Sequence, residues 1–152
     1  MYEHISILLC DDDLDDCHFF KDALETLSQT AKLTIVHDGE QLMHLLKETK
    51  SLPDVLFLDL NMPRKNGFEC LSEIKLDAKL KHLPIIIFST SLEQEVLKQL
   101  YNNGARYFIR KPAEFTQIQK MLQHALMLIT QGMDSQPSRE NFVLTVHNGL
   151  VT

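Results

Sequence analysis

Acidic side chains collect after two of the most apolar stretches of the chain. Asp11, Asp12 and Asp13 closely follow the run at residues 5–9, and Asp59 ends the run VLFLD. Carboxylates that lie within a few ångströms of one another repel unless one is protonated or a cation is bound. Oxygen ligands with room for water suit Mg²⁺, which often bridges to a phosphoryl group. If the fold brings these acids together, they predict a magnesium site.

A hydroxyl and an ammonium group follow two further apolar runs. Ser89 follows residues 85–88, and Lys111 comes shortly after residues 107–109. A transferred phosphoryl group needs such donors around its oxygens, and an aspartate can accept it as an aspartyl phosphate. Taken singly, each residue has an ordinary explanation, since Asp13 can cap a helix, Ser89 can be a core hydroxyl and Lys111 can lie on the solvated surface. Their occurrence together, each after an apolar run, favours phosphoryl chemistry.

The apolar runs also predict the elements that position these side chains. They have strand length, and their lack of polar alternation is typical of a parallel sheet covered on both faces. The segments between them repeat apolar residues at spacings of three and four, which indicates helices. We therefore predict a flavodoxin-like doubly wound α/β fold, with a five-stranded parallel sheet in the order 2-1-3-4-5 and helices on both faces. The expected strands lie at residues 5–9, 33–36, 55–58, 85–88 and 107–109.

Ligands in open parallel sheets bind beyond the carboxyl ends of the strands, near the point where the strand order reverses. In the predicted order, this point lies between the first and third strands, which are the strands that the acids follow. The fold class and the positions of the polar residues thus predict the same site.

Composition and charge exclude several other classes of protein. The chain has 152 residues, 44% of them hydrophobic, and a net charge of −6, which indicates one soluble domain and argues against direct nucleic-acid binding. Cys10, Cys17 and Cys70 are odd in number and irregularly spaced, so we expect reduced thiols. The amino terminus lacks a basic region and a long apolar run, so we expect a cytoplasmic protein without membrane contact.

The composition changes after about residue 131. Residues 131–140 have the character of a loop, and residues 141–146 (NFVLTV) form a possible extra strand, because Phe142, Leu144 and Val146 alternate with polar or smaller residues. Such a strand could add to a sheet edge, pair with a second protomer or fold back on its own domain. A disordered end is the remaining alternative.

Four stretches of the chain resemble one known family. ILLCDDD, VLFLDLNMPRKNGFE, LPIIIFSTS and GARYFIRKP are similar to the strand ends of receiver domains of two-component response regulators, typified by the chemotaxis response regulator. On this resemblance, residues 1–131 form the receiver domain and residues 132–152 a C-terminal tail. The longer segment before the fourth strand resembles the stand-alone regulators paired with phytochrome-type histidine kinases.

The resemblance implies phosphorelay signal transduction and a set of site residues. Asp59 would accept a phosphoryl group from a sensor histidine kinase or a histidine phosphotransfer protein. Mg²⁺ would be held by Asp12, Asp59 and the backbone carbonyl of Asn61, with Asp11 acting through water. Asn61 and Ser91 would tune the lifetime of the phosphoryl group. The protein would not be an enzyme in the usual sense, although it would assist its own phosphorylation and dephosphorylation.

The resemblance also implies how the signal is passed on. Ser89 would be the switch hydroxyl, Lys111 would pair with the phosphoryl group, and Phe108 would be the aromatic switch. A cis peptide bond would join Lys111 to Pro112. The output would be a change of protein contacts, with a possible homodimer formed through the fourth helix, fifth strand and fifth helix or through the tail.

Three rival functions fit the residues less well. A Mg²⁺-dependent phosphatase of the haloacid-dehalogenase type needs an acid two residues after its nucleophilic aspartate, where this chain has Asn61. A flavin- or nucleotide-binding module needs a phosphate loop after the first strand, where five Asp residues between positions 11 and 16 would repel a phosphate. A degenerate receiver is disfavoured because every phosphorylation position is filled.

Overall fold

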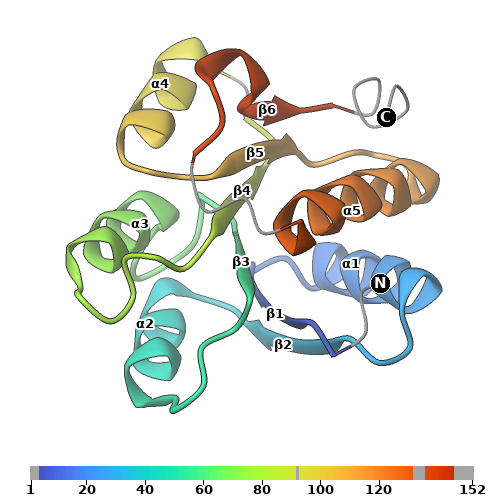
Figure 1. Cartoon of the computed structure of the whole chain (residues 1–152), viewed down its shortest axis with the longest axis horizontal. Helices are drawn as coiled ribbons and strands as arrows, with labels where there is room; N and C mark the ends of the chain where they lie inside the picture. Colours follow the sequence, from blue (N-terminus) through green and yellow to red (C-terminus); the bar gives the residue numbers. More distant parts are fainter. Residues whose placement is uncertain (1–3, 92, 132–135, 146–152) are drawn as a thin grey trace.

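A computed structural model describes residues 4–91, 93–131 and 136–145, and it contains one sheet with helices on both faces (Figure 1). The strands are Ser6–Cys10 (β1), Lys32–Val36 (β2), Val55–Leu58 (β3), Ile85–Ser89 (β4), Tyr107–Arg110 (β5) and Val143–Leu144 (β6). The helices are Leu14–Leu27 (α1), Gly39–Glu48 (α2), Gly67–Leu76 (α3), Gln94–Asn102 (α4), Phe115–Thr130 (α5) and the short 3₁₀ helix Arg139–Asn141 (η1). The first five expected strands are present, each displaced by at most one residue at either end.

The sheet has the strand order β2-β1-β3-β4-β5-β6, and every pair of neighbouring strands is parallel. The predicted order 2-1-3-4-5 is confirmed, but the sheet has six strands rather than the expected five. The additional strand comes from the tail and pairs with β5, with Phe108 opposite Val143 and Ile109 opposite Leu144. Of the alternatives for the tail, the structure therefore shows a strand added to the sheet edge of its own chain. Residue Val146 of the expected strand lies outside the described residues.

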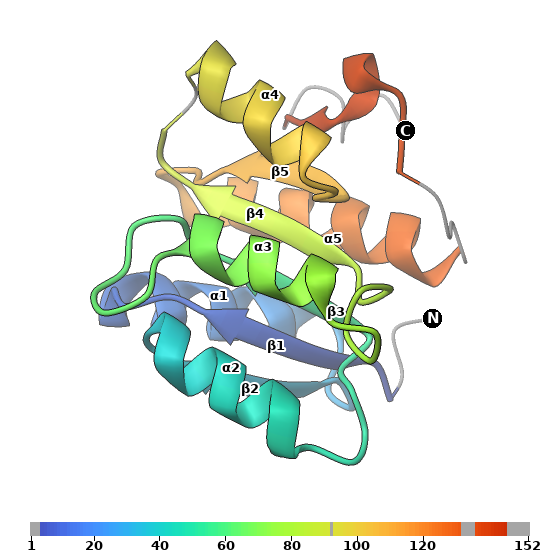
Figure 2. The same cartoon turned by 90° about the vertical axis from the view of Figure 1, so that its left-hand side faces the viewer.

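Two apolar layers cover the sheet. Helices α2, α3 and α4 lie on one face, and α1 and α5 lie together on the other (Figure 2). Strands β1, β3, β4 and most of β5 are buried, which explains why their sequences lack polar alternation. The core on the α2, α3 and α4 face includes Phe108 and Phe142, and the opposite core is built around Phe20 and Phe57.

Polar side chains fix the starts of the first three helices. The Asp13 carboxylate accepts a hydrogen bond from the Asp16 amide and caps α1, and Asp38 caps α2 in the same manner. Asn66 and Glu69 form a reciprocal capping box at the start of α3. α1 begins shortly after β1, and the first amide of α3, that of Gly67, donates back to the Leu60 carbonyl at 2.9 Å, so these caps hold the two loops that carry the acids.

The backbone corrects one expectation. No cis peptide bond occurs among the described residues, so the bond between Lys111 and Pro112 is trans, and the expectation of a cis bond is wrong for this structure. The two isomers of a bond before proline differ by only about 0.5–1 kcal/mol, so the local sequence does not decide between them and packing does. In the described part of the chain, none of the helices combines the length and the apolar character that crossing a membrane would require.

Candidate functional site

Three carboxylates meet at the carboxyl ends of β1 and β3. Cys10 lies opposite Leu58 in the paired strands, and the Asp59 amide donates to the Cys10 carbonyl at 3.0 Å, so the residues that follow are neighbours. Asp11, Asp12 and Asp59 can each offer an oxygen within 4.8 Å of the others. Asp11 and Asp59 are buried and Asp12 is exposed. The structure thus brings together the three acids that the sequence assigned to the metal site.

Lys111 provides the positive charge among these acids. Its Nζ lies 2.8 Å from Asp11 Oδ2, 2.8 Å from Asp16 Oδ2 and 3.6 Å from Asp59 Oδ2. The Lys111 side chain is only 10% exposed, so these interactions are weakly screened by solvent. An ammonium group in this position can pair with the oxygens of a phosphoryl group attached to Asp59.

Burial and charge shift the pKa values of the site in opposite directions. Burial raises the pKa of the Asp59 carboxyl from its ordinary 3.8 to about 7, and Asp11 adds to this rise, whereas Lys111 opposes it. Burial also raises the pKa of Asp11, although hydrogen bonds from Lys111 and from the Asp13 amide act to lower it. For Lys111, burial favours the neutral amine, but its carboxylate partners outweigh burial and raise its pKa. The site therefore holds more negative charge than one lysine compensates.

The donor set fits a hard divalent cation. All three groups near one another are carboxylates, and exposed Asp12 leaves one side of the cluster open to water. Magnesium prefers oxygen ligands, uses few protein groups and keeps several waters. A bound dication would favour the ionised form of Asp59, against the burial and the repulsion by Asp11 that raise the pKa of this carboxyl.

Ser89 and Phe108 are buried in adjacent strands beside the site. Ser89 ends β4, its side chain is fully buried, and its Oγ has no hydrogen-bond partner among the described residues. A buried hydroxyl without a partner is destabilising, and one in this position can donate a hydrogen bond to a ligand oxygen. Phe108 lies in β5 opposite Ile87 and is also fully buried. The Lys111 amide donates to the Ser89 carbonyl at 2.8 Å, which ties the two strand ends together.

Asn61 and Ser91 lie in the loops that follow β3 and β4. Asn61 is exposed and Ser91 is half-buried. Their positions two residues beyond Asp59 and Ser89 place them at the same edge of the sheet as the acids. No described hydrogen bond ties the side chain of either residue to the acids, so their roles remain proposals.

The structure adds two residues to the site that sequence reasoning missed. Asp16 was interpreted only as a favourable charge at the start of a helix, but its carboxylate is a partner of Lys111. Gly67 begins α3 against the backbone of Asp59, where a Cβ atom would lie 2.3 Å from the Asp59 carbonyl oxygen. The position of Asp16 in the first turn of α1 offered a signal, because α1 starts at the site. Gly67 lies in the stretch VLFLDLNMPRKNGFE that carries the family resemblance, but its close approach to Asp59 depends on packing.

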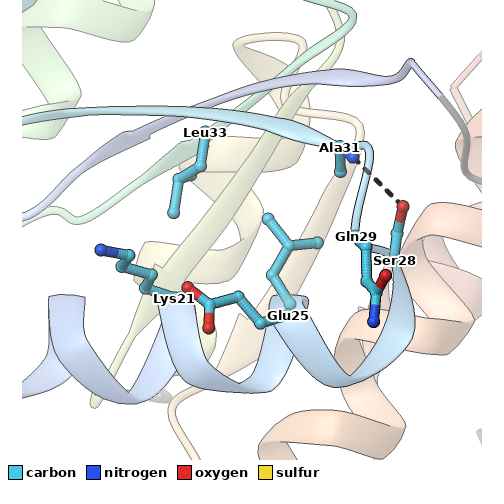
Figure 3. Close-up of a pocket in the computed structure, with 7 residues that line it drawn as sticks. Lys21, Glu25, Ser28, Gln29, Ala31 and Leu33 are labelled. Carbon is cyan, nitrogen blue, oxygen red and sulfur yellow. Dashed lines mark hydrogen bonds between the residues drawn. The ribbon is translucent and has the colours of Figure 1, made fainter.

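A cavity of about 480 Å³ lies elsewhere, between α1 and β2. Figure 3 shows Lys21 and Glu25 on α1 facing Leu33 of β2, with the Ala31 amide bonded to Ser28 Oγ at 3.2 Å. The cavity adjoins the end of α1 and the start of β2, which is the opposite edge of the sheet from the acids. It contains none of the predicted site residues and has no part in the chemistry discussed below.

Comparisons with known proteins agree with this geometry. The family model described as the response regulator receiver domain matches residues 7–123. Response regulator Rcp1 of Synechocystis sp. is 30% identical over 122 residues, which cover 77% of this chain and 83% of Rcp1. A probable methanogenesis regulatory protein, FilR2 of Methanothrix harundinacea, is 28% identical over 121 residues, covering 77% of this chain and 78% of FilR2.

Two solved structures extend the comparison to three dimensions. The phosphorylated cyanobacterial phytochrome response regulator RcpA superposes with a TM-score of 0.71 at 29% identity, covering 84% of this chain and 90% of RcpA. The Mn²⁺-bound form of Rcp1 superposes with a TM-score of 0.74 at 26% identity, covering 88% of this chain and 99% of that one. One of these relatives was thus crystallised with a phosphoryl group and the other with a divalent cation.

Proposed function

The chain belongs to the family of response regulator receiver domains, and we propose that Asp59 is the residue on which it accepts a phosphoryl group. Receiver domains take a phosphoryl group from histidine kinases in two-component signalling, so the chain is a phosphorelay signalling protein rather than a classical enzyme. The observation that carries the proposal is the buried Asp59 carboxylate, which lies 3.6 Å from Lys111 Nζ and beside two further acids.

In the proposed reaction, an Asp59 carboxylate oxygen attacks the phosphorus of a kinase phosphohistidine. The new O–P bond forms as the P–N bond breaks, and the electron pair of the broken bond leaves with the imidazole. Lys111 pairs with a phosphoryl oxygen, since its ammonium group already lies among the site carboxylates. Mg²⁺, held by Asp12, Asp59 and the backbone carbonyl of Asn61 with Asp11 acting through water, would offset negative charge on the phosphoryl oxygens.

Ser89 and Phe108 couple this chemistry to the surface in our proposal. The buried Ser89 Oγ, which has no partner in the described structure, donates a hydrogen bond to the attached phosphoryl group. Its movement toward Asp59 vacates space that the Phe108 ring fills, which shifts α4, β5 and α5 between two packings. Hydrolysis by water resets the protein, and Asn61 and Ser91 tune the rate of that step.

The partners follow from the same proposal. A sensor histidine kinase or a histidine phosphotransfer protein supplies the phosphoryl group, and the output is a protein contact, including a homodimer through α4, β5 and α5 or through the tail. The cytoplasm is the proposed location, because Cys10, Cys17 and Cys70 are free thiols. Light scattering with and without phosphorylation tests the dimer, since an unchanged mass would exclude it.

Phosphorylation by a small donor tests the central step. We expect the chain to gain one phosphoryl group from acetyl phosphate in the presence of Mg²⁺ and none in the presence of EDTA. Asp59→Asn should abolish the gain. Asp54→Asn is the matched control, because Asp54 precedes β3, at the end of the strand opposite Asp59. Its carboxylate accepts a hydrogen bond from the Ser6 amide at 2.7 Å. Full labelling of the Asp59→Asn variant would refute the proposal.

A further inference from the structure

A segment of the tail covers the edge formed by α4 and β5. We define residues 136–144 as the C-terminal strap, which is the dark red segment beside α4 and β5 in Figure 1. Gln136 Nε2 donates to the carbonyls of Tyr101 and Ala105 at 2.7 and 2.8 Å, and Tyr101 Oη donates to the Pro137 carbonyl at 2.7 Å. The strap thus adds hydrogen bonds to one carbonyl in the last turn of α4 and to one in the loop between α4 and β5.

One aromatic side chain anchors the strap in the core. Phe142 is fully buried and packs edge-on against Tyr101, with ring centroids 5.3 Å apart. The Arg139 guanidinium lies 5.9 Å from the centroid of each of these rings. Phe142 belongs to the same apolar core as Leu97 of α4 and Phe108 of β5. Removal of the strap would therefore open an apolar site between α4 and β5.

The strap is bonded to the backbone of the residue proposed as the aromatic switch. The Phe108 amide donates to the Phe142 carbonyl at 3.0 Å, and Phe108 is opposite Val143 in the strand pair. Phe108 also pairs with β4, two residues before the level of Ser89. Strand pairing therefore links β4, which Ser89 ends, through Phe108 of β5 to the carbonyl of Phe142.

The strand of the strap is shorter than the other strands of the sheet. β6 has only two residues, whereas the other strands have four or five. Without it, β5 would be the edge of the sheet and would present unpaired amides and carbonyls to a partner. The strap therefore occupies the surface through which the proposed output contacts would form.

We propose that the C-terminal strap is an autoinhibitory cover of the α4–β5 edge and that phosphorylation of Asp59 releases it. This inference rests on the proposed function, because the movement of Ser89 and Phe108 is what withdraws the packing surface of Phe142. Occupation of the Asp59 site then weakens the attachment of the strap. Because such coupling is reciprocal, a weakened strap must strengthen binding at the Asp59 site. The released edge of β5 and the vacated Phe142 site become available to a protein partner.

Hydrogen exchange on the full chain tests the release. The probe is beryllium trifluoride with Mg²⁺, which mimics a phosphoryl group on a carboxylate. We expect exchange in peptides from residues 104–110 and 136–145 to become faster by about 5- to 150-fold, the usual range of allosteric coupling, while peptides from β1 and β2 are unchanged. Bound beryllium trifluoride with unchanged exchange in both peptides would overturn the inference.

Reciprocity provides a second test with a matched control. Gln136→Ala removes the hydrogen bonds to the carbonyls of Tyr101 and Ala105, and Phe142→Ala removes the apolar anchor, so both variants should bind beryllium trifluoride more tightly. Glu140→Gln alters an exposed strap residue and should leave the affinity unchanged. Unchanged affinity in folded Gln136→Ala would overturn the inference even if Phe142→Ala fails to fold.

Failure of the inference is distinguishable from failure of the proposed function. A chain that gains a phosphoryl group from acetyl phosphate but keeps slow exchange in the strap contradicts only the release. A chain that neither gains a phosphoryl group nor binds beryllium trifluoride contradicts the proposed function, and the inference falls with it.

Discussion

Replacement of the phosphoacceptor should stabilise the metal-free protein. Asp59 is buried beside Asp11, and burial raises the pKa of its carboxyl to about 7. Asp59→Asn removes the charge while an amide oxygen can still accept the Leu60 amide hydrogen bond, which is 2.9 Å long in the structure. We therefore expect a higher free energy of unfolding for Asp59→Asn at pH 8 in EDTA.

The pKa of Asp59 fixes the sign and the size of this effect. Because the folded-state pKa lies above the ordinary 3.8, the folded chain binds the proton more tightly, and stability is lost as the pH rises from about 4 to about 7. At about 1.4 kcal/mol for each tenfold change in proton affinity, the complete loss is about 4 kcal/mol, and about 1.6 kcal/mol of it has occurred at pH 5. We expect Asp59→Asn to gain about 2–4 kcal/mol at pH 8 and distinctly less at pH 5.

Urea unfolding at both pH values, in EDTA and in Mg²⁺, measures this difference. Asp22→Asn is the control, because Asp22 is an exposed carboxylate on α1. Mg²⁺ should reduce the difference in free energy of unfolding between Asp59→Asn and the wild type, because it stabilises only the wild-type chain. At a Mg²⁺ concentration 100 times the dissociation constant, this stabilisation is about 2.7 kcal/mol. An Asp59→Asn variant that is less stable than the wild type at pH 8, or that shows the same pH dependence, would refute the reasoning.

Four further predictions concern the site and the strap. Lys111→Met leaves buried carboxylates without their counter-charge and should lower the free energy of unfolding in EDTA by about 3–5 kcal/mol, measured by urea unfolding. Gly67→Ala places a Cβ against the Asp59 carbonyl, so calorimetric Mg²⁺ affinity should fall and stability should drop by about 1–3 kcal/mol. Mg²⁺ affinity in titrations should fall up to about tenfold for each pH unit below about 7, because Asp59 must lose its proton to bind. Phe20→Ala should cost about 3–5 kcal/mol, whereas Phe142→Ala should cost less in the same unfolding assay, because the strap can detach while the remaining core stays folded. Equal costs for the two phenylalanines would contradict a detachable strap.

The fold was predictable because the amino-acid composition of its central strands shows that both of their faces are buried. β3 and β4 are continuous apolar runs, and only a sheet covered on both faces buries such runs completely. The attachment of β6 was not predictable in the same way. Alternating apolar residues suggested a strand over residues 141–146. Among its described residues, 141–145, only Val143–Leu144 form a strand, and Phe142 packs against Tyr101 as an anchor. Which edge a two-residue strand joins depends on packing that no local pattern encodes.

The sequence likewise predicted some features of the site, whereas others depend on packing. The acids and Lys111 could be placed at one edge because strand ends in a parallel sheet meet there. Their mutual distances, the partnership of Asp16 with Lys111 and the approach of Gly67 to Asp59 depend on how α1 and α3 pack. The isomer of the bond before Pro112 is another property of packing, and the expectation of a cis bond there was wrong.

Chemical mapping of the phosphorylated residue tests the central claim most directly. The chain is phosphorylated with acetyl phosphate and Mg²⁺, reduced with borohydride, which converts an aspartyl phosphate to homoserine, and then digested and sequenced by mass spectrometry. The account predicts homoserine at position 59 and unmodified aspartate at positions 11 and 12. Reduction at Asp11 or Asp12 with an unmodified Asp59 would contradict it.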